Sequence, residues 1–153
     1  MTAKNIYDSL NESHEKQRKL CKALLKTKAG TQERVDTFTD LRIELAAHAA
    51  AEERFLYAPI LMHDAGLWSA RHALHEHHAI DELIEDLQAQ EHAGPRWMAN
   101  AKKLTHQVLH HLREEEKKFF PVSGKLLSET QKVQAGAKYR KDYQRMREEL
   151  QNG

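Results

Sequence analysis

The sequence is poor in the residues that interrupt helices. Among its 153 residues there are only six glycines and three prolines, whereas charged residues make up 31%. The charged residues are rich in Lys, Glu and Arg, which favour helices over strands. A chain of this length suits one domain, which buries about two-thirds of the surface that its unfolded state exposes. We therefore expect a single all-α domain.

Cysteine and long apolar runs are also scarce. The single cysteine, Cys21, excludes an intramolecular disulfide, fits a reducing compartment and is interpreted as a small core residue. No run approaches the ~20 apolar residues that a membrane-spanning helix needs. The N-terminal residues 1–5 lack the apolar core of a signal peptide. We expect a cytoplasmic protein with no membrane partner.

The chain has no excess of charge of either sign. Its formal net charge is +1, and lysine and arginine are spread along the sequence instead of clustering. A nucleic-acid-binding protein usually carries a basic patch. We therefore expect no nucleic acid among the partners, while the oligomeric state stays open.

Apolar residues at spacings of three and four predict five helices. Short connections near residues 30, 65 and 94 predict that sequential helices pack antiparallel, as an up-down-up-down four-helix bundle. Residues 1–128 are expected to form this bundle, and residues 129–153 a C-terminal helix that packs on it or on a partner. The expected helices run from Asn5 to near Gly30, from Thr31 to Pro59, from Leu67 to Glu91, from Gly94-Pro95 onward, and, as a shorter fifth helix, from the capping box Ser128-x-x-Gln131.

The sequence contains an internal repeat. Aligning the Glu-Glu pair at 52–53 with the pair at 115–116 gives a shift of 63 positions (115 − 52 = 63). The same shift superimposes several apolar residues of the predicted helices. It also carries two histidines onto two others, His14 onto His77 and His48 onto His111.

Both copies place the same polar residues on an apolar face. A histidine and a glutamate four residues apart lie on one side of a helix. One further histidine interrupts the apolar stripe of the first helix and another that of the third. Counted from the predicted turns, these residues lie level to within about one helical turn. We therefore expect one core layer that contains His14, His48, Glu52, His77, His111 and Glu115.

Such a layer favours metal binding. Unpaired carboxylates and imidazoles facing an apolar interior would each cost several kcal/mol. Two divalent ions remove this cost, and imidazole nitrogen with carboxylate oxygen suits iron, zinc or manganese. The alternative is a structural bundle in which the histidines and glutamates only bond one another.

Seven histidines fall outside this layer and are interpreted mainly as surface residues. The pair formed by His110 and Glu114 has the same spacing, but its face is polar. Three histidines of the third helix stay open as additional ligands. The seven are His63, His72, His75, His78, His92, His106 and His110.

At these residues the chain resembles the hemerythrin family, in particular the bacterial HHE cation-binding domains, over about residues 5 to 122. That family has a histidine on helices one and three and His-x-x-x-Glu or Asp on helices two and four. The resemblance implies a four-helix bundle with a non-haem di-iron centre bridged by the two carboxylates. It assigns metal binding to His14, His48, Glu52, His77, His111 and Glu115. The best-known members bind dioxygen reversibly.

The chain departs from the oxygen carriers at one position. They have a further histidine one turn before the third-helix ligand, where this chain has Ala73. His72 is rotated by about 100° and would need a distorted helix to replace it. More open coordination suits peroxide or nitric oxide chemistry or iron sensing. Tyr7 and Tyr57 are possible neighbours but are interpreted as packing residues.

Three functions follow as hypotheses. The first is a di-iron protein that binds or senses dioxygen, peroxide or nitric oxide, with Glu53, Arg54 and Glu116 orienting the ligands. The second is a di-metal enzyme that activates oxygen or peroxide. The third is an interaction module in which the metals serve structure and the C-terminal helix docks a partner.

Overall fold

Five long helices account for most of the chain, of which the computed structural model describes residues 3–153. No strand occurs among these residues. The long helices are α1 (Ile6–Leu25), α2 (Gln32–Glu52), α4 (Leu67–Gln88), α5 (Pro95–Glu114) and α7 (Glu129–Asn152). Short elements connect them: η1 (Glu53–Tyr57), α3 (Ala58–Leu61), η2 (Asp64–Gly66), η3 (Glu115–Phe119) and α6 (Phe120–Gly124).

Polar side chains begin three of the long helices. Asn5 and Asp8 bond each other's backbone amides at the start of α1, and Ser128 and Gln131 do the same at the start of α7. Thr31 accepts the amide of the third residue of α2. These are the helix starts that the sequence predicts.

Two helix ends differ from expectation. α1 ends at Leu25, and Gly30, with φ of +74°, forms part of the turn that follows. α7 was expected to be short but is the longest helix, with 24 residues. No residue of its second half is buried, but this half is rich in helix-forming Lys, Arg, Glu and Gln, and ion pairs such as Arg145–Glu149 support it.

A π-helical turn follows the last regular turn of both α2 and α5. Proline has no amide hydrogen, and its ring clashes with the carbonyl four residues earlier. The wider turn lets the helical path continue past Pro59 to Leu61 instead of ending there. In each turn an amide bonds the carbonyl five residues earlier, Ala58 to Glu53 and Phe120 to Glu115.

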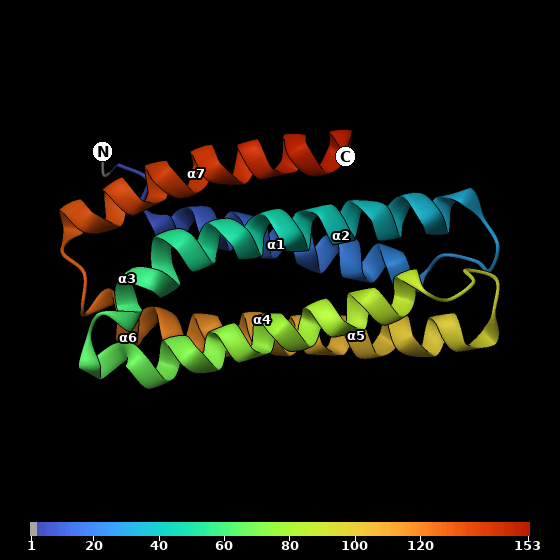
Figure 1. Cartoon of the computed structure of the whole chain (residues 1–153), viewed down its shortest axis with the longest axis horizontal. Helices are drawn as coiled ribbons and strands as arrows, with labels where there is room; N and C mark the ends of the chain where they lie inside the picture. Colours follow the sequence, from blue (N-terminus) through green and yellow to red (C-terminus); the bar gives the residue numbers. More distant parts are fainter. Residues whose placement is uncertain (1–2) are drawn as a thin grey trace.

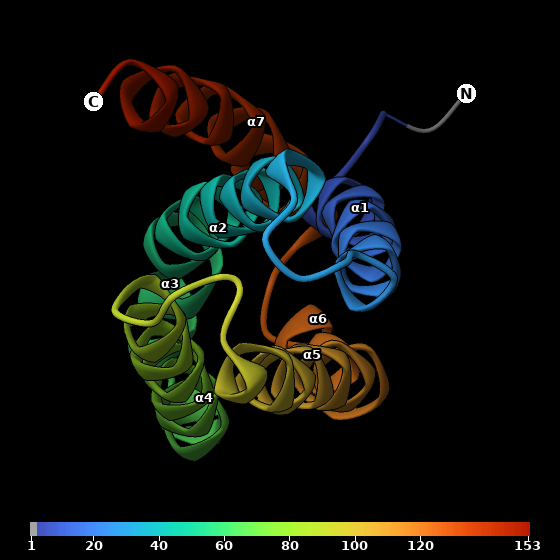
Figure 2. The ribbon, with the colours of Figure 1, turned by 90° about the vertical axis from the view of Figure 1, so that its right-hand side faces the viewer.

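The bundle has the predicted up-down-up-down order (Figure 1). Viewed along its length, α1, α2, α4 and α5 occupy four corners, and α7 lies outside them beside α2 (Figure 2). α7 contacts both α1 and α2. The stripe of α7 that includes Tyr139 and Tyr143 packs against this bundle. Within residues 3–153, no helix is both long enough and apolar enough to span a membrane.

The apolar core is divided into two clusters, with a polar layer between them. One cluster, near the turn between α1 and α2, includes Cys21, as expected, and Trp97. The other, towards the π-helical turns, includes Leu10 and Leu56. Along α1, His14 comes between the residues of the two clusters. The histidines therefore lie in mid-core, far from either end of the bundle.

Candidate metal centre

The structure brings all six predicted residues together in the layer between the two apolar clusters. Each is at most 5% exposed. His14 comes from α1, His77 from α4 and His111 from α5, so three helices contribute one histidine each. The remaining helix of the bundle, α2, supplies both His48 and Glu52. The remaining residue, Glu115, is the first of the π-helical turn after α5.

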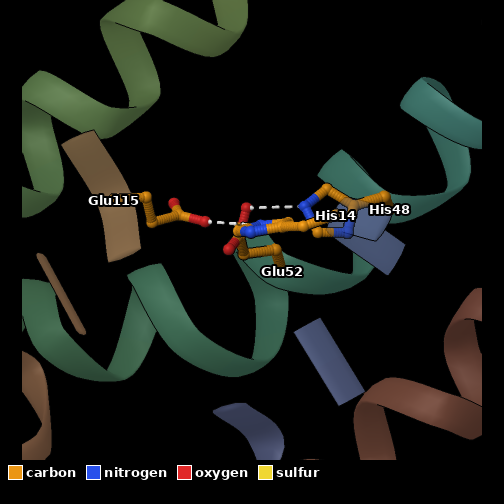
Figure 3. Close-up of side chains that lie close together, drawn as sticks. All are labelled: His14, His48, Glu52 and Glu115. Atoms are coloured by element: carbon orange, nitrogen blue, oxygen red, sulfur yellow. Dashed lines mark ion pairs between the residues drawn. The ribbon is translucent and has the colours of Figure 1, made fainter. Parts of the chain in front are cut away.

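One half of the layer is formed by α1, α2 and the turn after α5 (Figure 3). Nε2 of His14 lies 3.2 Å from Oε1 of Glu115. Nε2 of His48 lies 3.2 Å from Oε1 of Glu52. Each of the four residues offers one donor atom, and these atoms lie within 4.8 Å of one another, a spacing that suits a single ion.

The other half shares the two carboxylates. Nε2 of His77 lies 3.2 Å from Oε1 of Glu52 and 3.1 Å from Nε2 of His111. Nε2 of His111 lies 3.5 Å from Oε2 of Glu115. These four residues form a second group within 4.8 Å. Glu52 and Glu115 belong to both groups, so the two candidate groups share both carboxylates.

Every histidine of the layer directs Nε2 inward and Nδ1 towards a partner outside. In three of them a carboxylate oxygen lies 2.7 to 2.9 Å from Nδ1, and in the fourth the hydroxyl of a tyrosine lies 2.9 Å from it. Such partners fix the ring orientation of metal-binding histidines. The pairs are His14 with Glu116, His77 with Glu53, His111 with Glu76 and His48 with Tyr139.

These contacts leave polar atoms of the layer without partners. Nε2 of His14 and Nε2 of His48 each lie 3.2 Å from a carboxylate oxygen, as ion pairs that lack the geometry of a hydrogen bond. Together with Oε2 of Glu52 and Oε1 of Glu115 they are buried and make no hydrogen bond. A buried polar atom without a partner costs about 1–3 kcal/mol. A pair of divalent cations would satisfy all four atoms, so the residues present fit a dinuclear metal site.

Without metal, the layer holds protons tightly. Burial alone lowers the pKa of His14, but its contacts with Glu115 and Glu116 raise it to about 9. The pKa of His77 is likewise lowered by burial yet raised to about 10 by Glu52 and Glu53. Both imidazoles are thus cationic at neutral pH and balance the buried carboxylates. Metal ions compete with these protons for the same nitrogens.

Tyr57, which the sequence indicated as a possible neighbour of the site but favoured as a packing residue, adds an oxygen to the layer. Its ring packs on Phe119, as expected of a core residue. Its hydroxyl, however, bonds the carboxylates of both Glu52, at 2.9 Å, and Glu115, and lies 3.2 Å from Nε2 of His77. Burial, followed by the two carboxylates, raises the pKa of Tyr57 well above its usual value. The other candidate, Tyr7, bonds Ser123 instead.

The position of the missing histidine opens onto a cavity. Ala73 is buried and lines a cavity of about 40 Å³ together with His111, Glu115 and Phe119. His72 does not replace the missing residue, because α4 is regular here and Nε2 of His72 lies 3.2 Å from Glu114, outside the layer. The layer is therefore reached by a small space where the oxygen carriers have a ligand.

Of the three residues expected to contact the histidines and orient them, two do so. Glu53 and Glu116 contact histidines of the layer, and Arg18 holds Glu116 at 2.7 Å. Arg54 instead pairs with Asp142 of α7 at 2.7 Å. Glu76 and Tyr139, which also contact histidines of the layer, were not identified from the sequence as parts of the site. A signal for Tyr139 was present in the apolar stripe of α7, but nothing indicated what that stripe would touch.

Comparison with known proteins places the chain in a family. The model of the hemerythrin HHE cation-binding domain matches residues 5–123. Among solved structures, the chain is similar to a hemerythrin HHE cation-binding domain-containing protein from Mycobacterium kansasii, with a TM-score of 0.85 and 22% identity. The match covers 95% of this chain and 89% of that one, and at this identity it shows the fold alone. A search of curated proteins gave no match. The chain belongs to the hemerythrin HHE cation-binding domain family.

Proposed function

We propose that the chain binds two iron ions and presents them to a small diatomic or peroxidic ligand. The observation that carries this proposal is the set of buried Nε2 and carboxylate atoms that converge without hydrogen-bond partners. The metal-binding residues would be His14, His48, Glu52, His77, His111 and Glu115, with the Tyr57 hydroxyl as a further oxygen donor. We retain the cytoplasm as the proposed compartment, on sequence grounds.

Iron suits this donor set and the ligands proposed. Imidazole and carboxylate bind iron, zinc and manganese alike, but zinc has no redox chemistry. When bound, two irons supply electrons and an open coordination position to dioxygen, peroxide or nitric oxide. The chain's own residues hold the rings in place: Glu53, Glu76 and Glu116 each fix one histidine through Nδ1.

The cavity beside Ala73 supports a ligand of only a few atoms. Its volume is about 40 Å³, whereas about 10–15 Å³ on the same measure holds one water molecule. Phe119 and Ala73 give it an apolar wall next to His111 and Glu115. A space of this size admits a diatomic molecule or a peroxide.

Metal analysis with near-ultraviolet absorption tests the proposal. The purified protein should contain about two irons per chain and show an oxo-bridge band in air. His77→Ala should lower the iron content sharply, whereas His75→Ala should not, because His75 is an exposed residue of the same helix. One zinc ion per chain, or equal iron content in both variants, would contradict the proposal.

Access of the ligand is tested separately. Ala73→Val narrows the cavity without removing a donor atom, so the iron content should stay near that of the wild type. The spectral change on adding nitric oxide or azide should become smaller. Steady-state consumption of hydrogen peroxide, with Glu115→Ala as the inactive control, distinguishes catalytic turnover from reversible binding.

A further inference from the structure

A third group of imidazole and carboxylate donors lies beside the dinuclear layer, between α4 and α5. His72, Glu76 and Glu114 each offer one donor atom, and the three atoms lie within 4.8 Å of one another. Nε2 of His72 is 3.2 Å from Oε1 of Glu114 and 3.7 Å from Oε2 of Glu76. His110 approaches the same carboxylates, at 3.0 Å from Glu114 and 3.6 Å from Glu76.

These distances suit a metal ion better than a set of hydrogen bonds. A tetrahedral ion with bonds of about 2.0–2.1 Å separates its ligands by about 3.4 Å. The two distances from His72 bracket this value. The distances to Glu76 from His72 and His110, 3.7 and 3.6 Å, exceed the range of about 2.7–3.2 Å for hydrogen bonds, whereas those to Glu114 lie within it. By contrast, His78 and Glu82 of the same helix form an exposed ion pair at 2.7 Å, with no second helix converging on it.

Three further observations show that the group is built rather than accidental. Nε2 of His72 is buried and makes no hydrogen bond, although it faces two carboxylates. The His72 ring stacks on Trp68, with centroids 5.4 Å apart and planes 3° from parallel, which fixes the direction of Nε2. Glu76 is only 6% exposed, so its carboxylate is largely removed from water.

The group lines the cavity that leads to the inner layer. Trp68, 74% exposed, and Lys118, with a 78% exposed side chain, line its outer part. Buried His111 and Glu115 line its inner part. Glu76 connects the two, because its other oxygen, Oε1, lies 2.8 Å from Nδ1 of His111.

We propose that His72, Glu76 and Glu114 form a labile binding site for a single divalent cation at the mouth of this cavity, with His110 as an additional donor. Water completes the coordination, because the side chains of His72 and His110 are 37% and 48% exposed. A cation held here exchanges readily and lies on the way to the inner residues. A role of this site in passing iron to the inner residues, here called the passage role, rests on the proposed function. The existence of the binding site does not.

Cobalt(II) binding to the iron-loaded protein tests the site. Equilibrium dialysis should find about one cobalt beyond the iron in the wild type, since the inner positions are filled. Glu114→Gln and His72→Asn should lose this equivalent, whereas Glu82→Gln, the matched control on α4, should keep it. Cobalt should also quench the fluorescence of Trp68, and Trp68→Phe should remove the quenching while cobalt still binds.

Equal cobalt content in the wild type, Glu114→Gln and His72→Asn would overturn the site, provided that thermal unfolding shows the variants to be folded. This test does not depend on which metal occupies the inner layer, because it compares the amount of bound cobalt between the wild type and the variants. The passage role has its own test: Glu114→Gln should slow ferrous uptake without changing the final iron content. An unchanged uptake rate would overturn passage and leave the cation site standing.

Discussion

The hydroxyl of Tyr139 lies 2.9 Å from Nδ1 of His48, so a residue of α7 holds a histidine of α2. The same hydroxyl lies 2.7 Å from Oγ of Ser13 on α1. Tyr139 is outside residues 5–123, the part of the chain that the family model matches. The C-terminal helix thus takes part in the structure of the histidine layer and does more than cover the bundle.

Tyr139→Phe should weaken metal binding. The variant keeps the ring but removes the partner of Nδ1 of His48, a loss that typically lowers metal affinity about 10–100-fold. The measurement is retention of iron against a chelator. Tyr143→Phe is the control, because the Tyr143 hydroxyl bonds Glu44 and no histidine. Equal retention by the two variants would show that the Tyr139 hydroxyl does not support the site.

Gly136→Ala should disturb the contact between α7 and α1. A Cβ atom at Gly136 would lie 2.7 Å from the backbone carbon of Asn5 and 2.8 Å from the backbone nitrogen of Ile6. Backbone atoms cannot move aside as flexible side chains do, so we expect a loss of about 1–3 kcal/mol in the free energy of unfolding. This corresponds to roughly 2–4 °C per kcal/mol in thermal unfolding.

Gly124→Ala is the control for that experiment. Its Cβ would meet nothing closer than the Tyr7 hydroxyl at 3.8 Å, an ordinary contact. Its melting temperature should therefore stay close to that of the wild type. If both variants unfold at the same temperature, the close approach of α7 to α1 does not contribute to stability.

The positions of the six layer residues could be predicted because helical spacing fixes the direction of each side chain. The lengths between turns then fix its depth, and the repeat shows that two hairpins share one layout. His14 and His77 were identified because each interrupts an apolar stripe and because the repeat carries one onto the other. The fold and the positions of the six layer residues thus follow from helical spacing, the lengths between turns and the repeat.

The remaining contacts depend on features that these rules do not describe. Tyr57 lies in a π-helical turn, which changes the direction of side chains relative to a regular helix, so its hydroxyl reaches the layer. Glu76 lies about 100° around α4 from His77, and its contact with His111 depends on how α4 and α5 cross. Tyr139 reaches His48 only through the docking of α7, which no helical period determines.

The stability of the metal-free protein should fall as the pH rises above neutrality. The pKa values of His14 and His77 in the folded protein, about 9 and about 10, exceed the ordinary histidine value of about 6.5. The folded state therefore binds these protons more tightly than the unfolded state does. The resulting stabilisation is fully present below pH ~6.5 and is lost as the pH rises through these values.

Thermal unfolding between pH 6.5 and about 10 measures this effect. The melting temperature of the metal-free protein should fall by several degrees across that range. His75→Gln, at an exposed position of α4, should follow the wild type. A melting temperature that is constant or rises across the range would show that the folded protein does not hold these protons.

Metal binding to the metal-free protein should release protons at pH 7. At this pH the raised pKa values keep both His14 and His77 protonated, and each must lose its proton to bind a metal ion through Nε2. Burial alone raises the pKa of Glu52, but His48 and His77 hold it well below its usual value, so this carboxylate has no proton to release. We expect these imidazoles to release about two protons as both metal positions fill.

Calorimetric titration with zinc, in buffers that differ in ionisation enthalpy, counts the protons without redox side reactions. The dependence of the observed enthalpy on the buffer gives the number released. The number should be lower at pH 10 than at pH 7, because the pKa values of His14 and His77 are about 9 and about 10. Zinc binding with no proton release at pH 7 would mean that neutral imidazoles already face one another in the metal-free layer. The carboxylates would then lie beside neutral rings instead of cationic ones.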